Sequence, residues 1–310
     1  MPKTTPKNPA DFIVPLNMNG LDGRMMRMPA PRGKKREILL VYGHHAMLER
    51  WWGLVQNLNE FGAVTMPDLP GFGGMDSFYT INRKPTIDAF ADYLAAFIKL
   101  RYKRKRVTIV GISFGFVVVT RMLQRYPELV KKVDVLVSMV GFMHYGDFVF
   151  PPRRRAMLRH VSRLLATRPV AGIIRYGALN RFVITSLSKR MPNSKKRFIE
   201  VTTEEFDDTM EFEVRLWQAN DVRTHWRTTS EFLNVDNCRK RIGIPVHHVV
   251  STSEHYFDNE TVKQHMLVVF SGYSRYTARS KAHTPSILAD KKSMRIFVPP
   301  NLRRVLRKPV

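Results

Sequence analysis

Short apolar runs alternate with amphipathic segments between residues 36 and 141. The apolar runs cover residues 38–42, 62–66, 107–110 and 133–137, and they are rich in β-branched residues. Strands that are buried on both faces read as continuous apolar runs, whereas half-exposed strands alternate. The pattern therefore predicts a central, mostly parallel β-sheet.

The segments between these runs have helical spacing. Apolar residues recur at i, i+3, i+4 and i+7 from Ile87 to Ile98, and Thr86 is placed to cap the start of a helix over 86–100. A second helix is predicted over 51–58, and a third from Ser113 to near Tyr126, where Pro127 disfavours helical geometry. We therefore expect an α/β fold with helices on both faces of the sheet.

The pattern changes after Gly141. Residues 145–236 lack short β-branched runs and carry helix-length amphipathic stretches at 154–165 and 204–217. A strand pattern returns at 244–250, followed by a helix over 261–270 and a last strand near 273–278. These features predict four segments: a tail-like N-terminus with a first strand (1–35), the first part of the α/β core (36–144), an inserted helical lid (145–236) and the second part of the core (237–310).

Composition adds one unusual property, a formal charge of +25 from 51 Lys and Arg against 26 Asp and Glu. A hydrophobic content of 44% excludes global disorder in a chain of 310 residues. The basic clusters are scattered, and no nucleic-acid-binding module accompanies them. We interpret them as solvated surface with weak, nonspecific attraction to acidic surfaces, and we expect no specific nucleic-acid partner.

Cys238 is the only cysteine, so the chain can form neither an internal disulfide nor a cysteine-based metal site. The N-terminus has no apolar run of signal-peptide length, and the most apolar stretch, 107–120, is shorter than the ~20 residues that cross a bilayer. We expect a cytoplasmic protein without a transmembrane segment. The histidines lack the spacing of known metal motifs, so we expect neither metal nor cofactor.

The chemistry-bearing motif is Gly111-Ile112-Ser113-Phe114-Gly115, which follows one predicted strand and begins a predicted helix. A serine exposed at so sharp a turn needs small neighbours two residues before and after it, because larger side chains would clash. The helix that follows directs its N-terminus toward the same point and favours developing negative charge. This context indicates a nucleophilic serine.

From about residue 38 to 298, the sequence resembles the α/β-hydrolase family. Besides the serine motif, the resemblance rests on the loop 41–45, on the Asp-x-x-Gly-x-Gly turn from Asp68 to Gly73, and on Tyr126-Pro127-Glu128 before a strand. In the loop 41–45, Tyr42 stands where the family usually has a histidine. The resemblance implies the α/β-hydrolase fold and a serine hydrolase.

The family orders its catalytic residues as serine, acid and histidine. The resemblance assigns the histidine to His283, which follows the last predicted strand, and the acid to Glu254, although Ser251 replaces the usual glycine before it. Asp258 in the same loop is the rival acid. Its alternative interpretation is an N-cap for the helix that begins near Asn259.

The roles that follow are those of acyl transfer. His283 would accept the proton of Ser113 during attack on a carbonyl, and backbone N–H groups of His44 and Phe114 would form the oxyanion hole. Gly43, His45, Phe142 and Met143 would border the substrate. The expected substrate is a small molecule with a carboxylic ester or related acyl bond.

Other functions stay open on the sequence alone. A proline-releasing aminopeptidase would need a carboxylate in the lid to bind a free amino group, and the candidates are Glu204, Glu205, Asp207 and Asp208. A carbon–carbon bond hydrolase shares the same fold, and a non-catalytic protein that binds acidic partners is the alternative outside enzymes. The serine argues against the dehalogenase and epoxide-hydrolase branches, which use aspartate as the nucleophile.

Overall fold

The computed structural model describes residues 8–180, 182–184, 186, 203–280, 283 and 289–309, with the backbone alone at 203–206. Within this part of the chain, eight strands form one sheet in the order β1-β2-β4-β3-β5-β6-β7-β8. The strands from β4 to β8 are parallel, and β1 and β2 are antiparallel to their neighbours. The bounds are β1 Ile13–Met18, β2 Leu21–Met28, β3 Arg36–Val41, β4 Gly62–Pro67, β5 Val107–Ile112, β6 Val133–Met139, β7 Ile242–Ser251 and β8 Phe270–Ala278.

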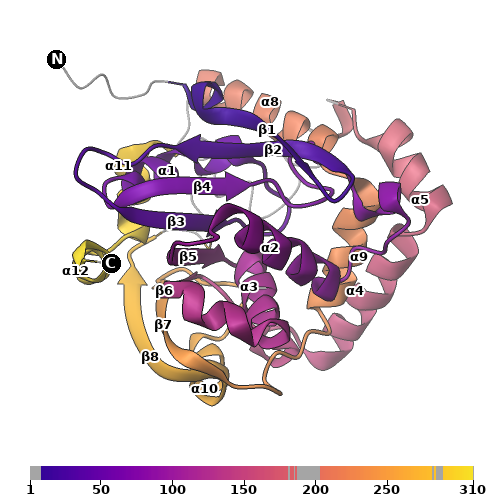
Figure 1. Ribbon diagram of the computed structural model, residues 1–310. Helices are drawn as coiled ribbons and strands as arrows, with labels where there is room; N and C mark the ends of the chain where they lie inside the picture. The colour runs from indigo at the N-terminus through magenta and orange to yellow at the C-terminus, as the bar shows by residue number, and fades with distance from the viewer. Residues whose placement is uncertain are drawn as a thin grey trace.

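Helices cover the two faces of this sheet, and further helices lie between β6 and β7 in the chain (Figure 1). This arrangement confirms the predicted α/β class and its mostly parallel sheet. The α-helices are α1 Trp52–Asn59, α2 Ile87–Arg101, α3 Phe114–Arg125, α4 Pro152–Leu165, α5 Arg168–Ile173, α8 Thr203–Ala219, α9 Val222–Phe232, α10 Asn259–Val269, α11 Lys291–Met294 and α12 Pro300–Arg307.

The helix boundaries follow from local chemistry. Thr86 caps α2 by accepting a hydrogen bond from the Ala89 N–H at 3.2 Å, as the sequence predicts. The helix α3 ends at Arg125, directly before Tyr126 and the proline that disfavours further helical geometry. The six predicted strands and the predicted helices of the core are all present, with shifts of a few residues at their ends.

The sequence predicts a tail with a first strand over residues 1–35, and the described residues from 8 onward form two strands instead of one. Residues 13–28 form a hairpin of two strands, β1 and β2, and β2 pairs with β4. Pro15, Asn17 and Gly20 interrupt the apolar pattern, which hides the strands. The position of β1 at the sheet edge explains why Pro15 is tolerated, because an edge strand does not need every N–H for pairing.

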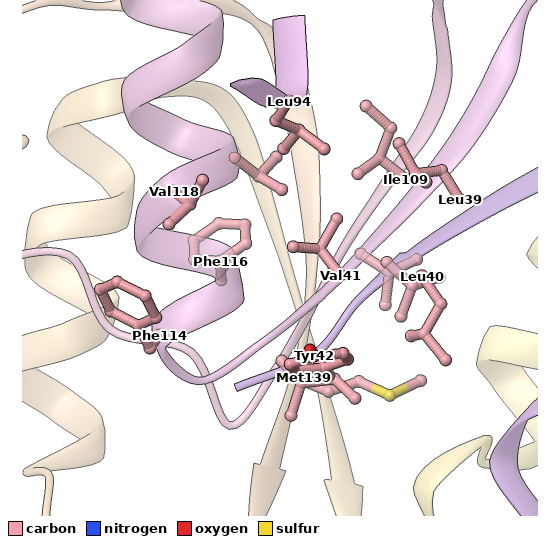
Figure 2. Close-up of a cluster of buried hydrophobic side chains, with 14 of the residues drawn as sticks. Leu39, Leu40, Val41, Tyr42, Leu94, Ile109, Phe114, Phe116, Val118 and Met139 are labelled. Atoms are coloured by element: carbon pink, nitrogen blue, oxygen red, sulfur yellow. The ribbon is translucent and has the colours of Figure 1, made fainter. Parts of the chain in front are cut away.

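One large hydrophobic core runs along both faces of the central strands. All six residues of β5 are buried, as expected for a strand covered on both sides. Figure 2 shows Phe116 and Val118 of α3 beside Val41 of β3, and all three belong to the main buried cluster. The helix that starts at the serine motif is therefore fixed against the middle of the sheet.

Residues 145–236 leave the sheet after β6 and return to it before β7. Among the described residues, this insertion consists of helices and short turns, with α4 packed against α9. Its two ends meet, because His144 and Asp236 form an isolated bridge and the Tyr145 N–H donates to the Val235 carbonyl. Backbone hydrogen bonds therefore join the beginning of the insertion to its end. In the part of the chain that the structure describes, no helix is long and apolar enough to span a bilayer.

Candidate active site

Ser113 lies at the junction of β5 and α3 in a strained conformation, with φ of +48°. A side chain at Gly111 would place its Cβ 2.7 Å from the Phe116 Cα, and one at Gly115 would place it 2.3 Å from the Val41 carbonyl oxygen. Both contacts are with backbone atoms that cannot move aside. The two glycines are therefore required by close approach, and the strain at Ser113 is held by the packing around it.

The structure brings Ser113, His283 and Glu254 together. His283 Nε2 lies 3.3 Å from Ser113 Oγ, and His283 Nδ1 lies 2.5 Å from Glu254 Oε2. The side chains of His283 and Glu254 are 12% and 4% exposed, so the pair is shielded from water. The carboxylate accepts from Nδ1–H, which leaves the lone pair of Nε2 directed at the serine hydroxyl.

Asp258 does not contact His283. It caps α10, accepting hydrogen bonds from the N–H and the hydroxyl of Thr261 at 2.8 and 2.6 Å. The Thr261 hydroxyl, followed by its N–H, lowers the pKa of this exposed carboxyl. Of the two acids that the sequence leaves open, Glu254 is the one beside the histidine.

The backbone at Gly43 and the start of α3 border the serine. A Cβ added at Gly43 would lie 3.3 Å from Ser113 Cβ, so the loop after β3 runs directly past the nucleophile. His44 follows in this loop, and its ring contacts the ring of Phe114 edge-on at 5.9 Å. His44 and Phe114 are the residues predicted to donate backbone N–H groups to an oxyanion. One precedes Ser113 in the chain and the other follows it, and their rings are in contact.

The side chains of His44 and His45 contact the insertion. His44 Nε2 lies 3.1 Å from the His225 carbonyl oxygen and 2.9 Å from Thr228 Oγ1, both on α9. A carbonyl can only accept, so Nε2 carries the proton. Burial lowers the pKa of His44 to about 4, which keeps the ring neutral. His45 has φ of +52°, and its Nδ1 lies 3.1 Å from the side-chain nitrogen of Asn220.

A buried network supports the turn from Asp68 to Gly73 and was not recognised from the sequence. The Tyr42 hydroxyl donates to Asp68 Oδ1 at 2.8 Å and accepts from the Leu69 N–H at 2.8 Å. Arg24 of β2 bonds Asp68 and donates to the Gly73 carbonyl at 2.6 Å. The substitution of tyrosine for the family's usual histidine was visible in the sequence, but its partners were not.

Phe142 and Met143, which the sequence suggests as substrate contacts, are buried in the core. The Phe142 ring stacks on Phe257 at 4.4 Å, and Phe257 contacts the His283 ring at 5.5 Å. Met143 is fully buried, and its N–H donates to Asp147 at 2.9 Å. Phe142 therefore supports the loop beside the histidine, and Met143 packs in the core rather than at an open pocket.

An apolar cavity of about 10 Å³, room for roughly one water molecule, adjoins His283. It is lined by Trp51, Leu54, Ile112, Met139, Val140, His283 and Phe297. Among the described residues, no three His, Cys, Asp or Glu side chains come together as a metal site. Asp207 and Asp208 of the insertion are exposed, and the side chains of Glu204 and Glu205 lie outside the described part.

Comparisons with known proteins agree with this fold. A family model described as the alpha/beta hydrolase fold matches residues 38–168. Among solved structures, an esterase from Thermogutta terrifontis has a TM-score of 0.61 and 14% identity, covering 95% of this chain and 98% of that chain. A mutant of an epoxide hydrolase from Bacillus megaterium has a TM-score of 0.64 and 13% identity, covering 94% of this chain and 98% of that chain.

An enol-lactonase from Burkholderia xenovorans is similar over 92% of this chain and 96% of that chain, with a TM-score of 0.62 and 11% identity. Identities this low show the fold alone. No curated protein matches the sequence. The family model over residues 38–168 and the similar structures agree that the chain has the α/β-hydrolase fold.

Proposed function

We propose that the protein is a serine hydrolase that cleaves a carboxylic ester or a related acyl bond. The observation that carries the proposal is the hydrogen-bonded chain from Ser113 Oγ through His283 to Glu254, with separations of 3.3 and 2.5 Å. A nucleophile, a base within reach of it and a third group that orients the base are the requirements for this chemistry. All three are side chains of this protein, on loops at the carboxyl ends of parallel strands.

The reaction would proceed in two steps. Ser113 Oγ attacks the carbonyl carbon while His283 Nε2 takes its proton, and Glu254 stabilises the imidazolium that forms. His283 then donates that proton to the leaving alcohol, which departs and leaves an acyl-serine. A water molecule, deprotonated by His283, attacks the acyl-serine and releases the carboxylic acid and free Ser113.

Developing negative charge on the carbonyl oxygen would be met by the N–H groups of Phe114 and His44. Loss of one such donor typically costs about 2.7–4 kcal/mol of transition-state stabilisation. The neutral His44 side chain, bonded to α9, would hold its own backbone in position for this role. The insertion that carries α9 would therefore act as a lid and also support the oxyanion hole.

The surroundings of His283 are apolar. The cavity beside it is lined by six apolar side chains, and Tyr256 and Phe257 contact the ring itself. Of the proteins with similar structures, one is an esterase and another an enol-lactonase, and both names denote cleavage of an acyl–oxygen bond. Both bonds are of the kind that the proposed reaction cleaves.

The experiment is active-site labelling with a fluorophosphonate, which reacts with an activated serine. The native protein should gain one covalent label on the peptide containing Ser113, and Ser113→Ala should gain none. A second control is Ser138→Ala, since Ser138 is buried and bonded to His248 at 2.9 Å and should not affect labelling. Absence of labelling in the folded native protein would contradict the proposal and favour a non-catalytic role.

A further inference from the structure

The exposed side of α4 carries an apolar stripe between basic residues. Met157, Val161 and Leu164 recur at i, i+4 and i+7 and are 57%, 44% and 60% exposed. The opposite side of the helix faces the protein, where Ser162 is buried and Leu158 packs against the core. A surface helix normally presents polar residues to water, so an outward apolar stripe requires another explanation.

The neighbouring segment also carries exposed apolar side chains. The helix α5 contacts α4, and the turn of π-helix at residues 174–178 follows it directly. Ile173 and Tyr176 are 72% and 91% exposed. In Figure 1, α4 and α5 lie along the right-hand side of the molecule. We call the stripe of Met157, Val161 and Leu164 on α4 the apolar face; Ile173 and Tyr176 belong to the segment that follows it.

The ionised side chains of this segment are all positively charged. Between residues 148 and 180 the sequence has no acidic residue, while it has seven arginines. Arg153 and Arg154 are exposed at the start of α4, beside the apolar face. Arg159 and Arg163 contribute differently, because they bond Asn234 and Ser230 and thereby hold α4 to the rest of the insertion.

We propose that the apolar face binds the surface of a lipid bilayer that contains anionic phospholipids. Aliphatic side chains and an exposed tyrosine can enter the boundary between headgroups and acyl chains, while adjacent arginines meet the lipid phosphates. A cluster of basic residues next to the membrane adds attraction that decreases with salt. Nucleic acid would use the arginines but would leave the aliphatic stripe exposed to water, so the lipid surface accounts for both features.

The test is cosedimentation of the full chain with two kinds of vesicle, phosphatidylcholine alone and phosphatidylcholine mixed with phosphatidylglycerol. Binding is expected to the mixed vesicles, weakening as salt is added. Replacing the helix stripe by serine (M157S, V161S and L164S together) should weaken binding by about tenfold or more, because these side chains would no longer be removed from water. Since all three are exposed, the variant should fold and melt as the native protein does.

Two matched double variants distinguish the effect of the arginines beside the apolar face from the effect of the protein's total charge. R153Q with R154Q removes two charges beside the apolar face, and K34Q with K103Q removes two exposed charges elsewhere. The first pair should weaken vesicle binding several-fold, and the second should leave it nearly unchanged. Equal effects of the two pairs, or full binding by the serine variant, would overturn the proposal and indicate nonspecific attraction. Because binding is measured without turnover, this result is independent of the proposed hydrolase activity.

Discussion

Two histidine–carboxylate pairs have the same separation between ring nitrogen and carboxylate oxygen. His283 Nδ1 is 2.5 Å from Glu254, and His265 Nδ1 is 2.5 Å from Asp147. Distance and residue type alone do not distinguish them. The loops that carry them are also joined, because the Asp258 N–H donates to the Asp147 carbonyl at 2.8 Å.

The difference lies in what else each pair contacts. The second ring nitrogen of His283 faces the Ser113 hydroxyl, whereas the other close neighbour of His265 is the ring of His144 at 4.4 Å. The fully buried Asp147 also accepts from the N–H groups of Met143 and His144. The first pair has the arrangement that the proposed reaction needs to move a proton, and the second ties α10 to the loop after β6. A hydroxyl at the far ring nitrogen is the feature by which we propose one pair as catalytic and the other as structural.

Removal of the nucleophile should have the largest effect. We expect Ser113→Ala to lower kcat for a short-chain aryl ester by about 10⁶-fold, because loss of one member of such a unit disables the rest. His283→Ala should do the same. Steady-state kinetics on folded variants provide the measurement, with circular dichroism as the check on folding. Activity near the native level in either variant would mean that this pair is not catalytic.

The acid provides the next largest effect. Glu254→Gln keeps the shape of the side chain but cannot stabilise the imidazolium, so kcat should fall by about 10⁴-fold. Asp258→Asn is the matched control from the same loop. It should leave kcat within a few-fold of the native value, because an asparagine can still cap α10. The opposite ranking in the same assay would assign the acid to Asp258.

Disruption of the His265–Asp147 pair should lower the stability of the fold and leave kcat nearly unchanged. Asp147→Asn leaves a buried amide in place of a carboxylate that accepts hydrogen bonds from three partners, and we expect a loss of about 1–3 kcal/mol in the free energy of unfolding. Denaturant titration measures this loss. The kcat of the folded variant should stay within a few-fold of the native value, and a loss as large as that of Glu254→Gln would mean that Asp147 acts in the chemistry.

The smallest effect is a pH dependence of stability. The hydrogen bond to Asp147 raises the pKa of His265 above its usual value of 6.5. The pair therefore stabilises the fold fully below pH 6.5 and less as the pH rises through the raised value. The difference in unfolding free energy between the native protein and His265→Gln should shrink over that rise. A constant difference across this range would show that the charge on His265 does not contribute.

The sequence predicted the parts of the molecule whose physics is local. Apolar runs located β5, a helix cap located α2, and the glycines beside Ser113 indicated the sharp turn. The serine came from its Gly-x-Ser-x-Gly context between a strand and a helix, the histidine and favoured acid came from a resemblance in motif order, and the structure brings those three side chains together.

What the sequence could not provide depends on contacts between distant residues. The hairpin at 13–28 is stabilised by pairing with β4, which no local pattern in it reveals. The contact of His44 with α9 joins residues about 180 positions apart, so spacing in the chain carries no sign of it. Phe142 was expected at a pocket because it follows a strand, but its stacking on Phe257 depends on a loop more than a hundred residues later.

Arg36, at the first residue of β3, has a practical consequence. Its buried guanidinium donates to the carbonyls of Leu306 and Lys308 at 3.0 and 2.7 Å and bonds Thr108 and Asp134. The last helix is thereby fastened at the amino ends of the parallel strands, the edge opposite to Ser113. A surface anchor or fused reporter joined after the last helix would leave the edge of the sheet that carries Ser113 unobstructed. Removal of the final helical turn would deprive the buried Arg36 guanidinium of two hydrogen-bond acceptors.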